Sequence, residues 1–524
     1  MAVPWRASTT RWPGMPSYGA VDIGSNSVRM QAAEVVPGGP VRVLAEDRQV
    51  TRLGDSVFAE GQINDEAVGL TIDVLSRMAK TLADHGVDKV RAVATSAVRD
   101  ARNQKEFLAA ARAALGTDVD VISGQEESRL IHLGVESKWP HPKDDILIVD
   151  IGGGSAELIQ GHGGHWKAAF SKPLGAVRLT QTFLKDDLPT ERQLHQLDEY
   201  IEEKLRPVVE AFGSDRPRRT IATAATASAV VCAAHRVPRS RRELVDRVRI
   251  SKAQLSRLYE NLSRRNLEDR RLTPGIGPRR AEVIIAGCAV LRRVLDDFKL
   301  PSLYYSRAGL RDGLIADLAQ EDAEARSSRL DDDRRRVVRE LARHYGVPLR
   351  HADKVAAMAV TLFESLQPLH ELPGSAGRYL EAAAYLHDIG HFVSDSRHHK
   401  HSYYLVANSD LAGFTARERM LVANLCRYHR KALPSANHDN FKALTDDDKR
   451  MVERLVPALR LADSLDRSRE QRVSDVRVRV RRSRVELQLV AQEEVDLEQW
   501  AAQQVEGAFQ QMYDRRLVVL QNGA

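Results

Sequence analysis

The stretch Asp22-Ile23-Gly24-Ser25-Asn26-Ser27 is repeated later in the chain as Asp150-Ile151-Gly152-Gly153-Gly154-Ser155. Each copy lies between two short apolar runs, a pattern that predicts a strand, a tight turn and a second strand. Two D-I-G-x-x-S turns in the same setting indicate an internal duplication. The sequence therefore predicts two related α/β domains that face each other.

The two turns have the composition of phosphate-binding loops. Glycine permits close backbone approach, and successive backbone N–H groups form a nest for anions. Asp22 and Asp150 add carboxylates at the strand ends, and Mg²⁺ prefers carboxylate oxygens together with retained waters. We therefore expect a clamp for a phosphate chain and Mg²⁺. Its phosphate-binding residues would be Gly24, Ser25, Asn26, Ser27, Gly152, Gly153, Gly154 and Ser155.

Two neighbouring glutamates are candidates for activating water. Glu126 and Glu127 lie in Ser123-Gly124-Gln125-Glu126-Glu127-Ser128, just before a helical stretch. Hydrolysis of a phosphoanhydride needs a carboxylate that orients water and accepts its proton. A carboxylate in the first turn of a helix is also stabilised by the positive end of the helix dipole. Spacing alone does not assign these two roles between the two residues.

The composition is that of a globular protein with a modest basic excess. The 524 residues carry a formal net charge of +6, with 43% hydrophobic and 29% charged residues. Such a balance suits a polyanionic partner. The three cysteines are far apart, which argues against disulfides and thiolate metal sites, and no apolar run approaches the ~18 residues of a membrane helix. We expect a cytoplasmic protein with no signal peptide, no membrane partner and no specific nucleic-acid partner.

Changes in composition and in hydrophobic periodicity divide the chain into five segments. After residue ~320 almost every stretch has helical periodicity. The last part alternates valine with arginine before a helical stretch, which predicts a hairpin plus a helix. The expected boundaries are 1–16 for an irregular leader, 17–124 and 125–320 for the two α/β domains, 321–472 for an all-α domain, and 473–524 for a small α+β segment.

Six motifs over residues 17–320 resemble the exopolyphosphatase/guanosine pentaphosphate phosphatase (Ppx/GppA) family. This resemblance implies an actin-like, ribonuclease H-like two-domain fold of the superfamily of acetate and sugar kinases, heat-shock proteins and actin. It also implies Mg²⁺-dependent release of terminal phosphate from inorganic polyphosphate or guanosine pentaphosphate, and a homodimer. The motifs are D-I-G-S-N-S at 22–27, T-S-A-V-R at 95–99, S-G-Q-E-E at 123–127, D-I-G-G-G-S-A-E at 150–157, P-L-G-A-V-R at 173–178 and S-R-A-G-L-R-D-G at 306–313.

The same resemblance implies roles for individual residues. Glu127, the second glutamate of S-G-x-E-E, becomes the catalytic base. Asp150 and Glu157 would bind or order the metal, and Asp22 is a further metal candidate. Arg99 would hold phosphate oxygens with its guanidinium fork. Further phosphate-binding candidates are Thr95, Ser96, Arg178 and Arg311.

One segment departs from the family pattern. The family usually has a third loop of the type G-T/S-x-G-T, whereas this chain has Ile221-Ala222-Thr223-Ala224-Ala225-Thr226. Alanines replace the glycines, so an anion nest there would be stiffer. The hydroxyls of Thr223 and Thr226 are the donors that this loop still offers.

An ordered set of histidines and aspartates marks the helical segment. His351, the pair His387-Asp388 and Asp463 lie on separate predicted helices, and imidazole with carboxylate suits a divalent metal. Over residues 330–470 this set resembles the HD metal-dependent phosphohydrolase superfamily, which implies a helical bundle with one or two metal ions. His401 and His429 fall where some members of that superfamily place extra ligands.

Our leading interpretation is a Mg²⁺-dependent exopolyphosphatase with Glu127 as general base. Guanosine pentaphosphate hydrolysis at the same site is the nearest alternative. A second alternative places the chemistry in the HD-type domain, which would then hydrolyse nucleotides while the actin-like half only binds. A non-hydrolysing phosphate or alarmone sensor and an ATP-driven kinase are further alternatives.

Overall fold

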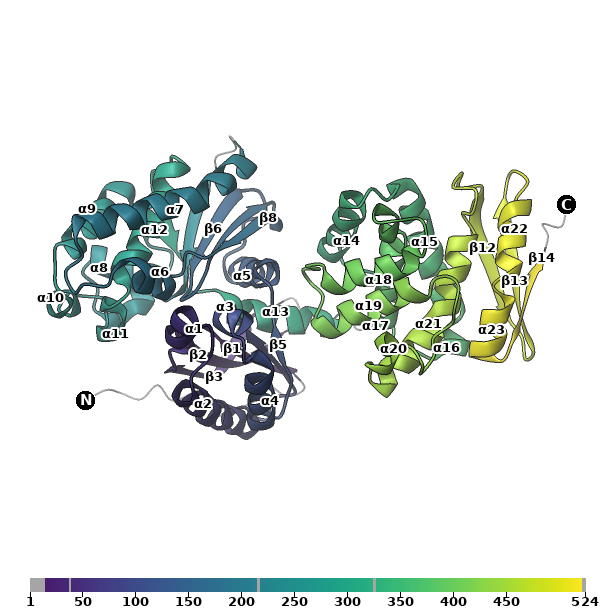
Figure 1. Ribbon diagram of the computed structural model, residues 1–524, viewed down its shortest axis with the longest axis horizontal. Coiled ribbons are helices and arrows are strands. Elements are labelled where there is room, and N and C mark those ends of the chain that lie inside the picture. Colours follow the sequence, from purple (N-terminus) through teal and green to yellow (C-terminus); the bar gives the residue numbers. More distant parts are fainter. Residues whose placement is uncertain (1–14, 37–38, 214–216, 324–326, 521–524) are drawn as a thin grey trace. The chain divides into compact units, whose positions relative to one another are not determined.

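A computed structural model describes residues 15–36, 39–213, 217–323 and 327–520 (Figure 1). The chain forms two compact units, Met1–Glu321 and Asp322–Ala524. Nearly all of the expected leader at 1–16 lies outside the described residues. No helix in the described ranges combines the length and the apolar character that crossing a membrane requires.

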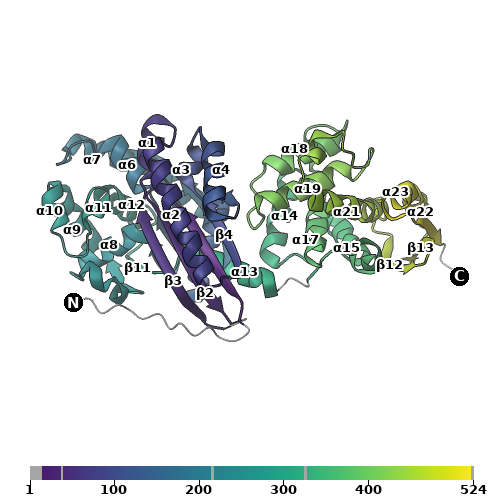
Figure 2. The same cartoon turned by 90° about the horizontal axis from the view of Figure 1, so that it is seen from below.

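The first sheet of the N-terminal unit has five strands in the order β3-β2-β1-β4-β5. β1 pairs antiparallel with β2 and parallel with β4, so Asp22, near its C-terminal end, lies at the centre of the sheet. Helix α2 (Asp65–Asp84), capped by Asn64, runs along one face of this sheet and buries Leu75 and Met78 (Figure 2). The strands are β1 (Ser17–Ile23), β2 (Ser27–Val35), β3 (Val41–Val50), β4 (Lys89–Ala94) and β5 (Val119–Val121).

The second sheet repeats this topology. Its order is β10-β11-β9-β6-β7-β8, and β6 pairs antiparallel with β7 and parallel with β9, as β1 does with β2 and β4. The repeat confirms the predicted duplication, and the two mixed sheets with their helices fit the expected actin-like fold. The strands are β6 (Asp145–Ile151), β7 (Ala156–His162), β8 (His165–Lys172), β9 (Arg219–Thr223), β10 (Arg249–Ser251) and β11 (Ser302–Tyr305).

Helices complete the cores of both α/β domains. In the second domain the apolar residues of α12 are buried among the inner faces of β6, β7 and β9 and the facing helices. Besides α2, the helices of this unit are α1 (Leu53–Glu60), α3 (Ser96–Asp100), α4 (Gln104–Leu115), α5 (Gly124–Lys138), α6 (Ala176–Phe183), α7 (Glu191–Phe212), α8 (Ala224–Ala234), η1 (Arg239–Val245), α9 (Lys252–Ser263), α10 (Leu267–Arg271), α11 (Pro278–Ala281), α12 (Ile284–Asp297) and α13 (Leu310–Ala323).

The C-terminal unit is built around a fully enclosed helix. Every residue of α17 from Ala376 to Leu386 is buried, and α14, α15, α19 and α21 pack against it. The helix ends at Leu386, and its C-cap residue His387 is buried inside the unit. The helices are α14 (Asp332–His344), α15 (Leu349–Ser365), α16 (Gln367–His370), α17 (Ser375–Leu386), η2 (Ile389–Phe392), α18 (His398–Asn408), α19 (Ala416–Tyr428), α20 (Asp439–Lys442) and α21 (Asp446–Ser464).

The last part of the chain differs from the expected hairpin plus helix. β12 (Val473–Val480) and β13 (Arg484–Ala491) form the hairpin, but a third strand, β14 (Arg516–Leu520), pairs parallel with β13. The expected helix is two helices, α22 (Asp496–Gln503) and α23 (Glu506–Tyr513). Leu517 of β14 is buried, so the third strand contributes to the core of this small sheet.

Candidate functional site

The two duplicated turns touch each other. Gly24 N donates to Ser27 O (3.2 Å) and Gly152 N donates to Ser155 O (3.0 Å), so each turn closes with the same bond. A Cβ on Gly153 would lie 3.0 Å from the Cβ of Ser25, and one on Gly154 would lie 2.9 Å from its Oγ. Glycine is required at 153 and 154 because the two turns approach this closely.

A small pocket of about 100 Å³, here called the clamp pocket, lies between the turns. Helix α3 and the N-terminal part of α5 complete its walls. It brings together most of the residues predicted from the sequence, and Arg29, Arg280 and Arg307 line it without having been predicted. The predicted residues in its lining are Asp22, Gly24, Ser25, Asn26, Ser27, Thr95, Ser96, Glu127, Asp150, Gly152, Gly153, Gly154, Ser155 and Arg311.

The two neighbouring glutamates, Glu126 and Glu127, have different surroundings in the structure. Glu126 forms ion pairs with Arg129 (2.8 Å) and Arg91 (3.2 Å), and both arginines also pair with Asp317. Glu126 is therefore part of a buried charge network. Glu127 lines the clamp pocket instead, and its Oε2 is buried without a hydrogen-bond partner.

The environment of Glu127 increases the affinity of its carboxylate for a proton. Burial and the nearby Glu157 raise the pKa of Glu127 well above its usual value, while Arg99, 3.7 Å away, opposes the rise. Burial and Asp150 raise the pKa of Glu157 to about 7. Glu157 accepts a hydrogen bond from Ser171 Oγ (2.8 Å), and its Oε2, like that of Glu127, has no hydrogen-bond partner.

The two aspartates stand in similar places with different neighbours. Asp22 lies opposite Arg29 in the β1–β2 register, whereas Asp150 lies opposite Glu157 in the β6–β7 register. Burial raises the pKa of both aspartates. The half of the cleft around Asp150 therefore concentrates carboxylates, and the half around Asp22 combines a carboxylate with a cation.

The donor set fits Mg²⁺ held largely through water. Within the described residues no three carboxylate or imidazole atoms of this cleft converge within 4.8 Å. Mg²⁺ usually keeps several waters and takes one or two carboxylates, so convergence of that kind is not required. The Oε2 atom of Glu157, which has no hydrogen-bond partner, and the buried carboxylate of Asp150 are the oxygens available for its shell.

The three predicted arginines occupy different settings. Arg311 lines the clamp pocket and lies 3.7 Å from Glu46. Arg99 lies behind Glu127 and donates to the carbonyl of Ile122 (2.6 Å). Neither it nor Arg178 is among the residues that line the pocket.

Arg178 is engaged by the protein itself. Its Nε donates to Gly154 O (2.9 Å), it pairs with Asp100, and its guanidinium lies 4.0 Å from the centre of the Phe58 ring. These contacts hold the second turn in place. Arg178 therefore positions the glycine turn in this structure rather than presenting a free guanidinium to a ligand.

The third loop keeps the backbone shape of a glycine loop despite its alanines. Ala224 has φ +64°, in the left-handed region that favours glycine. Thr223 directs its hydroxyl to Asp150 Oδ2, and Thr226 donates to the carbonyl of Ile151 (3.3 Å). The two hydroxyls thus fix the strand that carries Asp150, and the alanines 224 and 225 line the clamp pocket.

A second cavity of about 810 Å³ opens beside the clamp pocket. The sequence patterns did not predict it, because its basic side chains come from six separate segments of the chain. We call it the arginine chamber, after the ten basic residues in its lining: Arg29, Arg48, Lys138, Arg239, Arg242, Arg247, Arg279, Arg280, Arg307 and Arg311.

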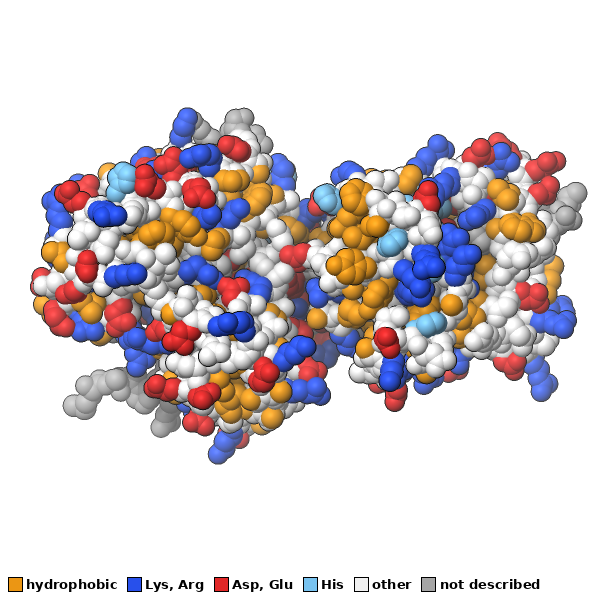
Figure 3. All heavy atoms as spheres, viewed as in Figure 1, with side chains coloured by type: hydrophobic (Ala, Val, Ile, Leu, Met, Phe, Trp, Pro, Cys, Tyr) orange, Lys and Arg blue, Asp and Glu red, His pale blue; other side chains and the backbone are white. Residues whose placement is uncertain are grey.

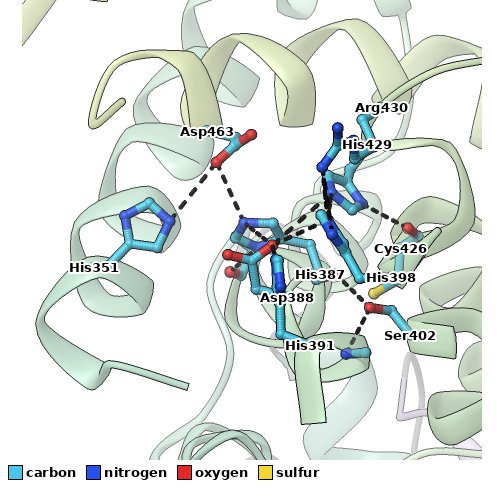
Figure 4. Close-up of polar contacts among 12 residues, drawn as sticks. His351, His387, Asp388, His391, His398, Ser402, Cys426, His429, Arg430 and Asp463 are labelled. Carbon is cyan, nitrogen blue, oxygen red and sulfur yellow. Dashed lines mark hydrogen bonds and ion pairs between the residues drawn. The ribbon is translucent and has the colours of Figure 1, made fainter. Parts of the chain in front are cut away.

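The four residues predicted as a metal site in the C-terminal unit converge (Figure 4). Asp463 Oδ1 lies 3.7 Å from His351 Nε2 and 3.4 Å from His387 Nε2, and the latter lies 3.6 Å from Asp388 Oδ1. These spacings surround a common point, and His351, His387 and Asp388 form a potential ligand group.

The orientation of both histidines fits metal binding. His351 Nδ1 donates to Asp466 (2.8 Å) and His387 Nδ1 donates to the carbonyl of Ala384 (2.8 Å). Their Nε2 atoms are buried and make no hydrogen bond. Metal-ligating histidines usually donate their other ring N–H in this way, which leaves the second nitrogen's lone pair for the ion.

A further group of ligand atoms shares Asp388. His391 Nε2 and His398 Nε2 each lie 3.5 Å from Asp388 Oδ1, and His429 Nε2 lies 4.0 Å from it. His429, predicted as an extra ligand, therefore lies beside this group, and its role as a ligand stays a prediction. His401, predicted as an extra ligand, belongs to neither ligand group in the described part of the chain; His398, which was not predicted, is the α18 histidine next to Asp388.

Cations surround this centre as well. Arg469 pairs with Asp388 Oδ2 (2.8 Å), and Arg430 lies 3.3 Å from the ring nitrogens of His398. Figure 3 shows basic side chains gathered beside histidines on the visible face of the C-terminal unit. The arrangement is suited to an anionic ligand at a metal ion.

The chain is similar to several solved structures. The crystal structure of the Aquifex aeolicus Ppx/GppA family member is 29% identical, with a TM-score of 0.52 over 59% of this chain and 99% of that chain. An exopolyphosphatase-like protein is 29% identical, with a TM-score of 0.54 over 59% and 99%. An exopolyphosphatase from Cytophaga hutchinsonii is 25% identical, with a TM-score of 0.54 over 58% and 98%.

Family comparison agrees with the geometry. Residues 334–504 match Ppx/GppA phosphatase, domain III, so the assignment of the helical part as an HD-type domain stays a prediction. Residues 32–322, more than half of the chain, match the Ppx/GppA phosphatase family. The chain therefore belongs to the Ppx/GppA phosphatase family, whose members are phosphatases.

Proposed function

We propose that the protein is a Mg²⁺-dependent exopolyphosphatase that releases terminal orthophosphate from inorganic polyphosphate. The observation that carries this proposal is the position of Glu127. Glu127 lines the pocket between the two abutting turns, and its carboxylate oxygen Oε2 is buried without a hydrogen-bond partner. A water held between that oxygen and a phosphate in the turns would be placed for attack on phosphorus.

In this mechanism Glu127 orients the water and accepts one of its protons. The water oxygen forms a bond to the terminal phosphorus while the bond from phosphorus to the bridging oxygen breaks. The shortened chain keeps that oxygen with its electrons. Backbone N–H groups of the two turns and the side chain of Arg311 stabilise the charge on the transferring group. Mg²⁺, when bound at Asp150 and Glu157, would neutralise further phosphate charge.

Guanosine pentaphosphate is the second candidate substrate for the same site. It presents a similar terminal phosphoanhydride, so the clamp pocket alone does not favour one substrate over the other. Comparing kcat/KM for long-chain polyphosphate and guanosine pentaphosphate with the same enzyme separates them. A preference for the nucleotide would overturn the polyphosphate assignment while leaving the hydrolytic site in place.

We also propose a divalent metal centre of the HD type in the C-terminal unit. The convergence of His351, His387, Asp388 and Asp463 supports it, and mixed imidazole and carboxylate ligands suit zinc, iron or manganese. Its activity would be a nucleotide phosphohydrolase. A chelator selective for transition metals, with Mg²⁺ in excess, should stop that activity and spare polyphosphate hydrolysis.

Cytoplasmic location and assembly as a homodimer belong to the same proposal. Both rest on composition and on family resemblance. Sedimentation of the purified protein tests the dimer, and a monomer at micromolar concentration would contradict it.

The direct test of the main proposal is phosphate release from long-chain polyphosphate in the presence of Mg²⁺. The wild-type protein should release orthophosphate until the chains are short. If no phosphate is released from polyphosphate or guanosine pentaphosphate under conditions in which the protein is folded, the cleft is not a hydrolytic site.

A further inference from the structure

Asp388 is shared by two groups of potential metal ligands, which we together call the histidine centre. Oδ1 of its carboxylate lies 3.6 Å from His387 Nε2 and 3.5 Å from both His391 Nε2 and His398 Nε2. Oδ2 instead accepts a hydrogen bond from Arg469 (2.8 Å). The histidine nitrogens and the guanidinium therefore use different oxygens of the same carboxylate.

The ion pair between Arg469 and Asp388 is easily broken. The Arg469 side chain is 47% exposed, and half-exposed pairs of this kind contribute little to stability. A divalent metal ion held beside Oδ1 would weaken the pair further, because it would neutralise the carboxylate and repel the guanidinium. The Arg469 side chain would therefore be free to take another partner once such an ion is bound.

Arg469 lies on a turn that is anchored to the histidine centre. The buried carboxylate of Asp466 accepts hydrogen bonds from His351 Nδ1 (2.8 Å) and from the backbone N–H of Gln471 (2.7 Å). Arg469 and Gln471 have φ values of +60° and +54°, in a region where residues with side chains are strained. Strain of this kind persists where the surrounding structure fixes it, and it is common at ligand-binding sites. The backbone thus keeps Arg469 next to Asp388 while its side chain can reorient.

A second arginine, Arg430, lies beside His398 (Figure 4). Its Nη1 is 3.3 Å from both ring nitrogens of His398, whose Nε2 is 3.5 Å from Asp388 Oδ1. Arg460 of α21 fixes the turn that carries Arg430 by donating to the carbonyl groups of Tyr428 and of the two residues after Arg430. Arg430 forms no ion pair with any residue that the structure describes. It is therefore a cation without a counter-charge, held next to potential metal ligands.

Arg430 and Arg469 together match one phosphate group. An arginine presents parallel N–H donors that fit two oxygens of a phosphate, and such bonds are roughly twice as strong as neutral ones. Within the described ranges, Asp388 is the one carboxylate that pairs with either arginine. If a metal ion neutralises Asp388, both guanidinium groups lack a counter-charge. A phosphate dianion would balance the two charges.

We propose that Arg430 and Arg469 bind the phosphate group of a ligand at the histidine centre, and that Arg469 becomes available when a metal ion replaces it as the partner of Asp388. This inference rests on the proposed metal centre and specifies how that centre holds its ligand. Phosphate binding there depends on the metal, because the metal-free protein keeps Arg469 on Asp388. The ligand carries a phosphate dianion, which a nucleoside monophosphate or free orthophosphate can supply.

The test uses Co²⁺ as the metal, because its visible absorption changes when a ligand binds next to it. The full-length protein is loaded with Co²⁺ in excess Mg²⁺, which occupies the cleft, and orthophosphate is then added. Arg469→Gln should raise the phosphate concentration for half-saturation by roughly 10-fold or more, because a hydrogen bond between charged groups is lost. Its affinity for Co²⁺ should not fall, since the substitution removes a cation that competes for Asp388.

Three further variants separate charge from structure. Arg430→Gln should also weaken phosphate binding and leave the Co²⁺ affinity unchanged. Arg469→Lys keeps the charge without the guanidinium fork and should recover part of the phosphate affinity. Arg477→Gln, at an exposed arginine of β12 in the same unit, is the matched control and should change neither affinity.

Two results would overturn the inference alone. A 10–100-fold loss of Co²⁺ affinity in Arg469→Gln would mean that Arg469 only positions Asp388, as residues behind metal ligands do. Co²⁺ binding by the wild type with no response to phosphate would show that the arginines form no phosphate site. A wild type that binds no Co²⁺ would instead contradict the proposed metal centre, and the inference with it.

Repeating the titration with adenosine 5′-monophosphate distinguishes the two sources of the phosphate group. A response at lower concentration than for orthophosphate identifies a phosphate ester as the ligand. A response at the same or a higher concentration identifies free orthophosphate. Either response, weakened in Arg469→Gln and in Arg430→Gln, supports the phosphate site.

Discussion

The two charged centres of this protein differ in the ligands they offer. The cleft of the N-terminal unit presents carboxylate oxygens, hydroxyls and backbone N–H groups, and no three acidic side chains among its described residues converge within 4.8 Å. The centre in the C-terminal unit gathers imidazole nitrogens and the Asp388 carboxylate within 4.8 Å. The first set suits phosphate with a hydrated hard cation, and the second suits a tightly held borderline metal.

Under the two proposed functions, this difference would let one chain carry two kinds of phosphate chemistry without mixing them. In the cleft the buried Glu127 would activate water directly, so a metal would serve only to neutralise charge. In the C-terminal centre the histidines would hold a metal that activates water itself. The two centres should therefore respond to different substitutions and to different chelators.

Substituting the two adjacent glutamates should produce the sharpest contrast. Glu127→Gln should lower kcat for polyphosphate by roughly 10²–10⁴-fold, because the general base is lost, and KM should change little. Glu126→Gln should instead destabilise the fold by about 3–5 kcal/mol, because it leaves Arg91 and Arg129 with one buried partner fewer. Steady-state kinetics and thermal melts distinguish the two. Equal loss of kcat in both variants at full folding would contradict the assignment of Glu127.

Metal content should separate the C-terminal centre from the cleft. Asp388→Asn should lose most of the bound transition metal, because Asp388 takes part in both ligand groups. His401→Ala is the matched control and should retain the metal, since His401 belongs to neither group in the described residues. Elemental analysis after dialysis measures the metal bound per protein molecule in each variant. Full metal content in Asp388→Asn would remove the proposed centre.

The contact between the two turns predicts a smaller effect. A Cβ at position 154 would lie 2.4 Å from Ser96 Oγ and 2.5 Å from the Phe58 ring. Gly154→Ala should therefore separate the turns and lower kcat/KM by roughly 10–100-fold. Gly69→Ala, in helix α2 with nothing near the added methyl group, should leave the kinetics unchanged. Wild-type kinetics in Gly154→Ala would mean that close contact of the turns is not needed.

The pH dependence of stability should report on Glu157 in the metal-free protein. Its pKa of about 7 in the folded protein lies above the ordinary value of 4.5, so the folded state binds the proton more tightly. The free energy of unfolding should therefore decrease as pH rises from about 4.5 to about 7, and the lost stability is not recovered above pH 7. Glu157→Gln should remove this part of the decrease, up to about 3 kcal/mol. Melting curves in EDTA check this, and parallel pH profiles for the two proteins would contradict it.

The smallest effect is expected at the third loop. Ala224 adopts φ +64°, which costs an alanine roughly 1–2 kcal/mol relative to glycine, partly offset by the greater freedom of glycine in the unfolded chain. Ala224→Gly should raise the free energy of unfolding by about 0.5–1 kcal/mol. Ala227→Gly, in the same helix α8, should lower it. Chemical denaturation of the two variants resolves the difference, and a loss of stability in Ala224→Gly would show that the loop is unstrained.

Local sequence patterns predicted the elements that surround the turns. The D-I-G-x-x-S repeat located β1, β2, β6 and β7, because a strand, a tight turn and a strand leave a strong local signal. Strand β3 (Val41–Val50) was not predicted, since its charged residues at 46–48 interrupt any apolar alternation. The third strand of the C-terminal sheet was missed because its partner β13 lies more than 20 residues away.

Functional details that depend on contacts between residues far apart in the chain could not be predicted from the sequence. Glu126 and Glu127 differ because Arg91 and Asp317 meet next to one of them, and neither is near it in the chain. The choice of His398 over His401 depends on where helix α18 begins, since α18 starts at His398. The arginine chamber depends on the pairing of β2 with β3, which places Arg48 opposite Arg29.

The central claim is that phosphate release takes place in the cleft and depends on Glu127. The most direct measurement is phosphate release from long-chain polyphosphate with excess Mg²⁺ by wild type, Glu127→Gln and Asp388→Asn in one assay. The account predicts equal rates for wild type and Asp388→Asn, and a rate lower by roughly 10²–10⁴-fold for Glu127→Gln. A wild-type rate in Glu127→Gln together with loss in Asp388→Asn would contradict it and move the chemistry to the histidine centre.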